Sequence, residues 1–170
     1  VSTVLTYFNK FIKRFPNINT LANAKEERVL ELWSGLGYYA RARNLHKTAI
    51  RVSKNYEGKF PSSFDTLLSL PGIGRSTAGA ISAFAFKKNK PILDGNVKRV
   101  FTRYFGIKEW AGKLSVEKEL WEIATRNLPK TNKHIHTYTQ ALMDLGATIC
   151  RRNQPLCNNC PLQSKCISFE

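Results

Sequence analysis

Hydrophobic side chains recur every three to four positions along almost the whole chain, and strictly alternating hydrophobic and polar residues are scarce. A repeat near 3.6 residues is typical of amphipathic helices, whereas strands alternate with a period of two. The pattern predicts helices at about 2–14, from 29 to Gly35 or Gly37, and at 38–56, 64–70, 75–86, 96–105, 116–127 and 136–150. The core stripe expected in the third of these consists of Ala42, Leu45, Ala49 and Val52. We therefore expect an all-α protein.

A length of 170 residues allows one domain or two small lobes. A basic stretch that ends at Pro91 interrupts the helical pattern, so we place a lobe boundary near 88–91, with lobes at 1–89 and 90–170. No apolar run long enough for a membrane span occurs, and no signal peptide is visible. Helical periodicity is already present at Val1, which is not a methionine, so we expect a fragment of a longer protein.

Lysine and arginine outnumber acidic residues by 27 to 12, which leaves a formal net charge of +15. This charge favours a polyanionic partner such as nucleic acid. A membrane surface would require a basic amphipathic helix with an exposed apolar face, and the sequence shows no clear example. The basic residues are spread over both halves of the chain, so we expect one long phosphate track. Its members include Arg41, Arg43, Lys47, Arg51, Lys54, Lys87, Lys88, Lys90, Lys98, Arg99, Arg103, Arg151 and Arg152.

The chain carries four cysteines, which all lie near its C-terminus with the spacing C-x6-C-x2-C-x5-C. Four thiolates on one short loop can surround a single metal centre. Only Cys157 and Cys160 form the tight C-x2-C pair that structural zinc prefers. The longer outer spacings to Cys150 and Cys166 suit a [4Fe–4S] cluster. Zinc and a pair of disulfides remain as alternatives, although disulfides are typical of small secreted proteins.

The segment Leu70-Pro-Gly-Ile-Gly-Arg-Ser-Thr-Ala-Gly79 lies inside a predicted pair of helices at about 64–86. Gly72 and Gly74 permit unusual backbone angles and close approach of a partner. The N–H groups at the start of the second helix form a site for an anion. In so basic a chain, this pattern predicts a helix-hairpin-helix that holds a DNA phosphate without reading base sequence. A plain helix–helix turn, which also favours Pro and Gly, is the alternative.

Asp94 lies in the loop Pro91-Ile-Leu-Asp-Gly-Asn-Val-Lys-Arg99, before a predicted helix. On these residues alone, Asp94 or Asn96 caps that helix. The functional alternative is a carboxylate in a basic cleft that stabilises positive charge developing on a sugar.

In combination, these motifs make the chain resemble the helix-hairpin-helix base-excision DNA glycosylases over nearly its whole length. The resemblance is carried by Leu70-Pro-Gly-Ile-Gly74, Leu93-Asp-Gly-Asn-Val97 and the cysteine loop at 150–166, in this order and spacing. Within this family, the most similar branch is that of the MutY-type adenine DNA glycosylases. Its pattern matches Leu32-Trp-Ser-Gly-Leu-Gly-Tyr-Tyr-Ala-Arg-Ala-Arg-Asn44, the loop at 91–99 and Met143-Asp-Leu-Gly-Ala147.

The resemblance implies a two-lobed helix-hairpin-helix glycosylase fold whose C-terminal loop holds a [4Fe–4S] cluster on the four cysteines. It implies a monomer that removes adenine mispaired with 8-oxoguanine or guanine in double-stranded DNA of the bacterial nucleoid, in the cytoplasm. Bifunctional members of the superfamily carry a Schiff-base lysine at the position of Ser76, and a hydroxyl cannot form an imine. We therefore expect a monofunctional glycosylase that uses water, with Ser76, Asp94 and Asn96 at the catalytic site.

The resemblance also implies that Tyr38 wedges into the base stack next to the flipped base. Ordinary packing at a helix start is the alternative for this residue. The residues expected to contact DNA are Tyr38, Arg41, Gly72, Gly74, Arg75, Ser76 and Thr77.

In the family, the general acid is a glutamate in a helix that precedes the segment matching Val1, and a domain that verifies 8-oxoguanine lies beyond the cysteine loop. Glu26 and Glu27 lie in a loop-like stretch and do not match that glutamate, so we expect the chain alone to bind DNA with little excision. Two alternatives remain. One is a pyrimidine-directed relative of the endonuclease III type, which Ser76 argues against, and the other is a non-catalytic iron–sulfur DNA-binding module.

Overall fold

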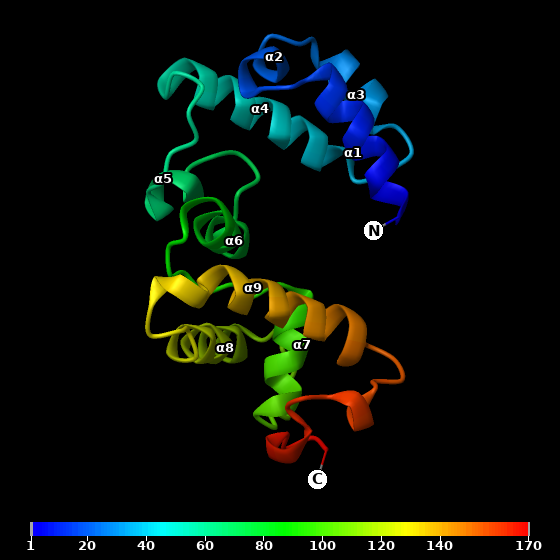
Figure 1. Ribbon diagram of the computed structural model, residues 1–170, viewed down its shortest axis with the longest axis vertical. Helices are drawn as coiled ribbons and strands as arrows, with labels where there is room; N and C mark the ends of the chain where they lie inside the picture. The colour runs from blue at the N-terminus through cyan, green and yellow to red at the C-terminus, as the bar shows by residue number, and fades with distance from the viewer. Residues whose placement is uncertain (1, 170) are drawn as a thin grey trace. The chain divides into compact units, whose positions relative to one another are not determined.

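The computed structural model describes residues 2–169, with side chains from residue 4 onward, and this part of the chain contains helices and no strand (Figure 1). The prediction of an all-α protein is therefore confirmed. The α-helices are α1 (Ser2–Arg14), α2 (Ile18–Ala22), α3 (Glu26–Trp33), α4 (Tyr39–Asn55), α5 (Phe64–Leu68), α6 (Arg75–Phe86), α7 (Gly95–Tyr104), α8 (Leu114–Arg126) and α9 (Ile135–Asp144). The shorter turns are η1 (Asn132–His134), η2 (Leu145–Ile149), η3 (Cys157–Asn159) and η4 (Gln163–Lys165), of which η2 is a π-helix.

Two local differences from the sequence prediction lie before α4. The hydrophobic pattern does not predict α2, because five residues are too few to show a helical period. A reciprocal capping box stabilises this helix: Asn17 Oδ1 accepts a hydrogen bond from the Thr20 N–H at 2.9 Å, and Thr20 Oγ1 accepts one from the Asn17 N–H at 3.4 Å. Glu26 and Glu27, expected in a loop-like stretch, lie in the first turn of α3. Carboxylates at this position interact favourably with the positive end of the helix dipole.

The chain divides into two compact units, Val1–Ile73 and Gly74–Glu170. The sequence places a lobe boundary later, at 88–91, and so assigns α6 to the first lobe. In the structure, α6 contacts α9, and Gly79 of α6 lies so close to the Pro91 carbonyl that a Cβ would collide with it. These contacts place α6 in the second unit.

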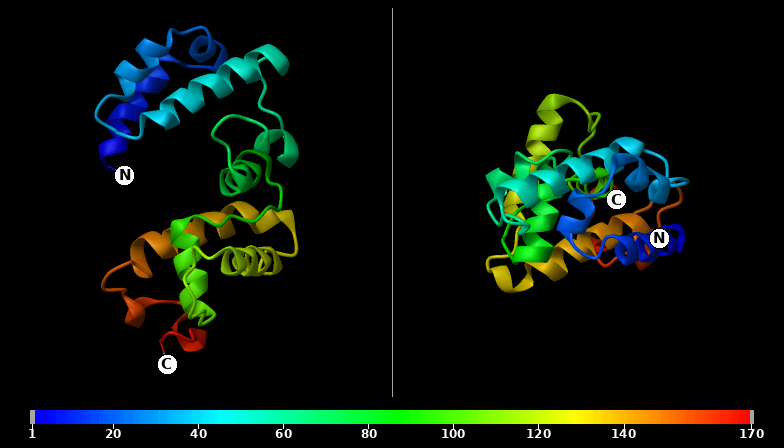
Figure 2. Two further views of the ribbon diagram at one scale, coloured as in Figure 1. Left: turned by 180° about the vertical axis from the view of Figure 1, so that it is seen from behind. Right: turned by 90° about the horizontal axis from the view of Figure 1, so that it is seen from above.

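Helix α4 is central to the first unit, because both α2 and α3 pack along it (Figures 1 and 2). The expected core stripe is confirmed at Ala42, Ala49 and Val52, which are buried, whereas Leu45 is 38% exposed and lies outside the core. A small hydrophobic cluster completes this unit and consists of Phe15, Leu21, Val29 and Ala49.

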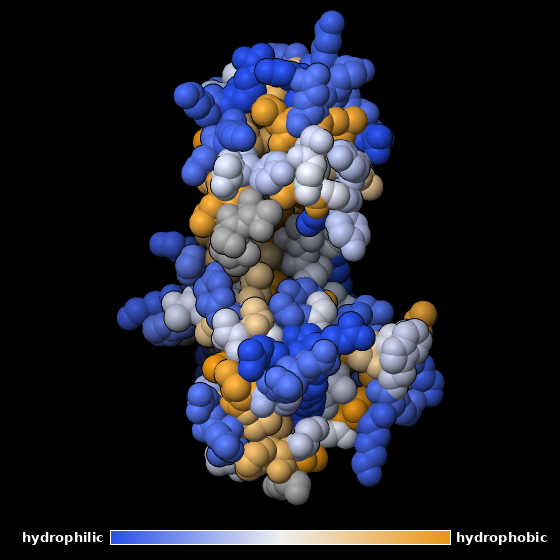
Figure 3. Space-filling model, turned by 90° about the vertical axis from the view of Figure 1, so that its right-hand side faces the viewer, coloured by the Kyte–Doolittle hydropathy of each residue, from blue (hydrophilic) through white to orange (hydrophobic). Residues whose placement is uncertain are grey.

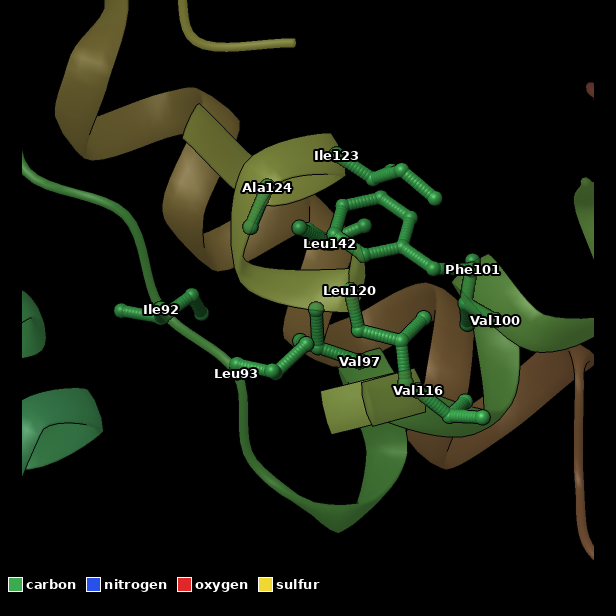
Figure 4. Close-up of a cluster of buried hydrophobic side chains, with 10 residues drawn as sticks. All are labelled: Ile92, Leu93, Val97, Val100, Phe101, Val116, Leu120, Ile123, Ala124 and Leu142. Atoms are coloured by element: carbon green, nitrogen blue, oxygen red, sulfur yellow. The ribbon is translucent and has the colours of Figure 1, made fainter. Parts of the chain in front are cut away.

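The second unit has a hydrophobic core built mainly from α7 and α8, to which Leu142 of α9 adds one buried side chain (Figure 4). Ile92 and Leu93 project into it from the segment before α7, and each is only 4% exposed. Leu93 lies beside Val97 of α7 (Figure 4), and a Cβ at Gly79 of α6 would lie 3.3 Å from Ile92 Cγ2. The core therefore anchors the backbone immediately before Asp94.

Hydrophilic side chains dominate the face of the molecule shown in Figure 3, and hydrophobic side chains are exposed there as separate patches. In the first unit, the exposed hydrophobic residues of α1 are Val4, Leu5, Phe8 and Ile12. None of the helices in the described residues combines the length and the apolar character needed to cross a bilayer.

Candidate nucleic-acid interface and catalytic loop

The glycine turn after α5 is held by side chains of α4. Thr48 Oγ1 donates a hydrogen bond to the Pro71 carbonyl oxygen at 2.8 Å. Gly72 has a φ of +75°, and a Cβ at this position would lie 2.6 Å from Asn44 Cβ. Both the backbone angle and the lack of space therefore require glycine. The first glycine of the predicted hairpin is thus part of the packing of the first unit.

The start of α6 presents unpaired N–H groups. Gly74 is the N-cap residue and provides no side-chain cap, so the N–H groups of Arg75, Ser76 and Thr77 precede the intrahelical hydrogen bonds. A Cβ at Gly74 would have no neighbour within 4 Å. The helix start is therefore accessible, and its free N–H groups and positive dipole end can bind an anion.

A positive surface adjoins this helix start within the second unit. The Arg75 guanidinium lies over the ring of Trp121 on α8, 3.9 Å from the ring centroid. This cation–π contact orders the charge of Arg75. Lys118, Arg126 and one acidic residue, Glu122, line the same shallow groove on α8. Three cations of the second unit therefore lie around one groove that includes the first residue of α6.

Asp94 is the N-cap of α7. Its Oδ1 accepts a hydrogen bond from the Val97 N–H at 2.8 Å, as the capping interpretation of the sequence expects. The side chain is half-buried. A cap of this kind uses one carboxylate oxygen, so the group keeps further lone pairs that can interact with positive charge.

Asn96, in the first turn of α7, is held by Arg99. Arg99 Nη2 donates to Asn96 Oδ1 at 2.9 Å and to the Gly146 carbonyl at 2.6 Å. Its Nε donates to the Cys150 carbonyl at 2.8 Å. One arginine therefore links the helix that follows Asp94 to the π-turn η2 and to the start of the cysteine loop.

Ser76 contacts the loop that carries Asp94. Its Oγ accepts a hydrogen bond from the Leu93 N–H at 3.0 Å, and Leu93 directly precedes Asp94. The structure therefore places Ser76 against the residue that precedes Asp94, and Asn96 follows two positions later in the first turn of α7.

Tyr38 precedes α4 in the first unit with left-handed backbone angles, φ 50° and ψ 52°. These angles are uncommon for a bulky residue. Its side chain is 82% exposed, which does not fit the alternative of packing at the helix start. The Arg41 guanidinium lies 5.2 Å from the Tyr38 ring centroid and 5.9 Å from that of Trp33. Strained backbone at an exposed aromatic residue is typical of functional positions.

Several cations that the sequence assigns to the phosphate track have partners within the protein, among them Lys98, Arg99 and Arg103, and also Arg43, Arg51 and Arg151. Lys98 Nζ donates to Glu117 Oε1 at 2.8 Å, and this hydrogen bond lowers the pKa of Glu117. Arg103 donates to two carbonyl oxygens of the cysteine loop at 2.7 and 3.0 Å, and Arg99 binds the carbonyls described above. Their role within the fold corrects the expectation. Sequence reasoning missed it because the carbonyl acceptors of Arg99 and Arg103 lie 47 to 51 positions further along the chain.

The four cysteines are free thiols, each partly buried, and all four line one cavity of about 190 Å³ beside Arg103. Arg103 Nη1 lies 3.5 Å from Cys150 Sγ. Among the described residues, no three or more His, Cys, Asp or Glu side chains converge tightly enough to hold one metal ion. The possible donor set at this cavity is therefore four soft sulfur atoms.

Comparison with known proteins places these features in a family. A model described as "HhH-GPD superfamily base excision DNA repair protein" matches residues 1–126. The adenine DNA glycosylase of Buchnera aphidicola subsp. Baizongia pistaciae is 48% identical over 169 residues, which cover 99% of this chain and 47% of that protein. The adenine DNA glycosylase of Homo sapiens is 39% identical over 167 residues, 98% of this chain and 30% of that protein. The chain therefore spans about half or less of the length of these relatives.

Solved structures agree with the sequence relatives on the fold. A thermostable thymine-DNA glycosylase superimposes with a TM-score of 0.83 at 27% identity, over 96% of this chain and 75% of that one. A non-covalent endonuclease III–DNA complex gives a TM-score of 0.79 at 25% identity, over 99% of this chain and 76% of that one.

Proposed function

The chain belongs to the HhH-GPD superfamily of base excision DNA repair proteins, and from this premise we propose that it forms the core of a monofunctional adenine DNA glycosylase. The substrate is adenine mispaired with 8-oxoguanine or guanine in duplex DNA, and the reaction is hydrolysis of the N-glycosidic bond. The observation that carries the proposal is the half-buried carboxylate of Asp94 at the start of α7, beside a hydroxyl at Ser76 where an amine would be required for strand cleavage.

DNA binding begins with the phosphate backbone. The accessible start of α6 supports a contact to one phosphate through main-chain N–H groups, and Arg75 adds an ordered positive charge beside it. Such contacts hold any duplex alike and set its register. The positive charge of the chain as a whole supplies the long-range attraction.

The chemistry requires the adenine nucleotide to leave the base stack. The exposed and strained Tyr38 supports a wedge role at the gap that the flipped base leaves. As the glycosidic bond breaks, positive charge develops on the sugar. The Asp94 carboxylate stabilises that charge. Asn96, which Arg99 holds in place, orients the substrate beside this carboxylate.

Water then completes the reaction and leaves an abasic site with an intact strand. A hydroxyl at Ser76 cannot attack the sugar to form an imine, so β-elimination by that route is closed. This separates the proposed activity from that of bifunctional relatives of the endonuclease III type.

The cysteine loop fits a [4Fe–4S] cluster. Cys150, Cys157, Cys160 and Cys166 would hold it, because all four thiols line one cavity and their outer spacings suit a four-cysteine cluster. When bound, the cluster supplies four iron–thiolate bonds that order the loop. Independently of it, Arg103 holds the backbone of this loop at Arg151 and Arg152.

The test is an assay of single-turnover excision by the complete native protein. It is carried out at neutral pH, the pH of the bacterial cytoplasm in which we place the protein. Duplexes carry adenine opposite 8-oxoguanine, guanine or thymine, and a fourth duplex carries an oxidised pyrimidine. We expect abasic sites at adenine opposite 8-oxoguanine and guanine, with strands that break only after alkali. Excision of the pyrimidine instead would support the endonuclease III type, and tight binding without any excision would support a non-catalytic module.

A further inference from the structure

Helix α6 and the segment before Asp94 touch at two points on one face of the helix. Ser76 Oγ accepts the hydrogen bond from the Leu93 N–H at 3.0 Å. One turn later, Gly79 lies against the Pro91 carbonyl, with no room for a Cβ between them. Residues three apart share a helix face, so α6 forms a platform along which this segment runs.

The backbone that Ser76 contacts, at Leu93, is also held by the burial of the Leu93 side chain. The Leu93 side chain is 4% exposed in the core of the second unit, and a buried N–H group needs an acceptor. Serine supplies one, and its own hydroxyl proton remains available as a donor. Lysine could not replace it in this role, because an ammonium group has no acceptor.

We propose that Ser76 is a positioning residue: its hydroxyl oxygen fixes the Asp94 loop against the start of α6 and so sets the place of the catalytic carboxylate relative to the bound phosphate. This inference rests on the proposed function. It gives the serine a role of its own, beyond the lack of an amine. A small displacement of a catalytic group, on the order of 1 Å, can lower a rate by about 10²-fold, so one hydrogen bond at this point matters.

The experiment uses three substitutions in the complete native protein. Ser76→Ala removes the acceptor, and Ser76→Thr keeps a hydroxyl at the same position. The matched control is Ser82→Ala in the same helix, because the Ser82 hydroxyl is buried without a hydrogen-bond partner. Each variant is examined by amide hydrogen exchange at Leu93 without DNA, by DNA affinity and by single-turnover excision of adenine.

We expect Ser76→Ala to exchange the Leu93 amide faster, to bind DNA within about threefold of the unsubstituted protein, and to excise adenine between about 10- and 100-fold more slowly. Ser76→Thr restores both exchange and rate, and Ser82→Ala changes neither. Amides in α8 keep their protection in all three variants, which separates a local effect from general loss of stability.

Three results would overturn the proposal. The first is normal excision by Ser76→Ala, and the second is slow excision with unchanged exchange at Leu93, which would place the hydroxyl's role on the DNA. The third is failure of Ser76→Thr to restore either readout. If the unsubstituted protein excises no adenine, the proposed function fails, and the exchange comparison, which uses no DNA, still decides whether Ser76 holds the loop.

Discussion

At the scale of single residues, the two roles that the sequence presents as alternatives for Asp94, helix cap and catalytic carboxylate, are compatible with each other. The structure shows the cap, with Oδ1 2.8 Å from the Val97 nitrogen, and a cap needs only one carboxylate oxygen. The residues of the candidate site could be identified from the sequence because each motif is a short contiguous segment. The partners of Lys98, Arg99 and Arg103 could not, since a cation on a helix is equally suited to a phosphate or to a distant carbonyl.

The charge of Asp94 can be separated from its capping role by Asp94→Asn. The asparagine amide oxygen can still accept from the Val97 N–H, so α7 should keep its cap. The charge proposed to stabilise the sugar in the transition state is lost, and we expect single-turnover excision to fall by about 10²–10³-fold or more with DNA affinity nearly unchanged. Excision near the normal rate, in a protein with unchanged thermal stability, would leave Asp94 as a helix cap alone.

We predict different effects for valine substitutions at the two hairpin glycines. Gly74→Val should fold normally, because its φ of −82° suits valine and a Cβ there meets no neighbour. It should weaken binding to matched and mismatched duplexes alike, by about 10-fold or more, because bulk blocks a charge-assisted contact to phosphate. Gly72→Val should instead lower the thermal stability, given its φ of +75° and the contact with Asn44. Unchanged DNA affinity in Gly74→Val would remove the phosphate contact at α6.

At the scale of elements, hydrophobic periodicity predicts most helices well, and α1 and α6 have the predicted bounds. It does not find α2, which depends on a capping box, nor the end of α9. The sequence predicts one helix from 136 to Cys150, whereas α9 ends at Asp144 and continues as the π-turn η2. A π-turn changes the hydrogen-bond register by one residue, and a count of hydrophobic positions does not detect such a change.

The cysteine loop is the element that metal analysis can test. Cys157→Ser should lose iron and the broad visible absorption of a thiolate-bound cluster, because a serine hydroxyl is a poor ligand for iron. DNA affinity should fall as well, since the same loop carries Arg151 and Arg152. The control is Asn159→Ser in the same short turn η3, which should keep iron, colour and affinity. A protein that contains about one zinc per chain and no iron would contradict the cluster.

At the scale of the whole molecule, the sequence indicates the family, the all-helical class and a positive surface. It does not locate the division between the compact units, which lies at Ile73–Gly74. Proline and charge at 88–91 suggest a linker, but α6 belongs with α9 through contacts that no local pattern records. The formal charge of +15 likewise overstates the cations available to DNA, because several are used within the fold.

The salt dependence of DNA binding tests that last point. Each phosphate neutralised by the protein steepens the fall of log K with log salt by about one unit for duplex DNA. Arg41→Gln removes an exposed cation of the expected interface, so we expect the slope to become shallower by about one. Lys98→Gln removes the same formal charge, but Lys98 is bound to Glu117 at 2.8 Å, so its slope should match that of the unsubstituted protein. Equal changes of slope in both variants would mean that DNA binding depends on the total charge of the protein. The individual positions of Arg41 and Lys98 would then not matter. A flat plot for the unsubstituted protein would remove the phosphate interface altogether.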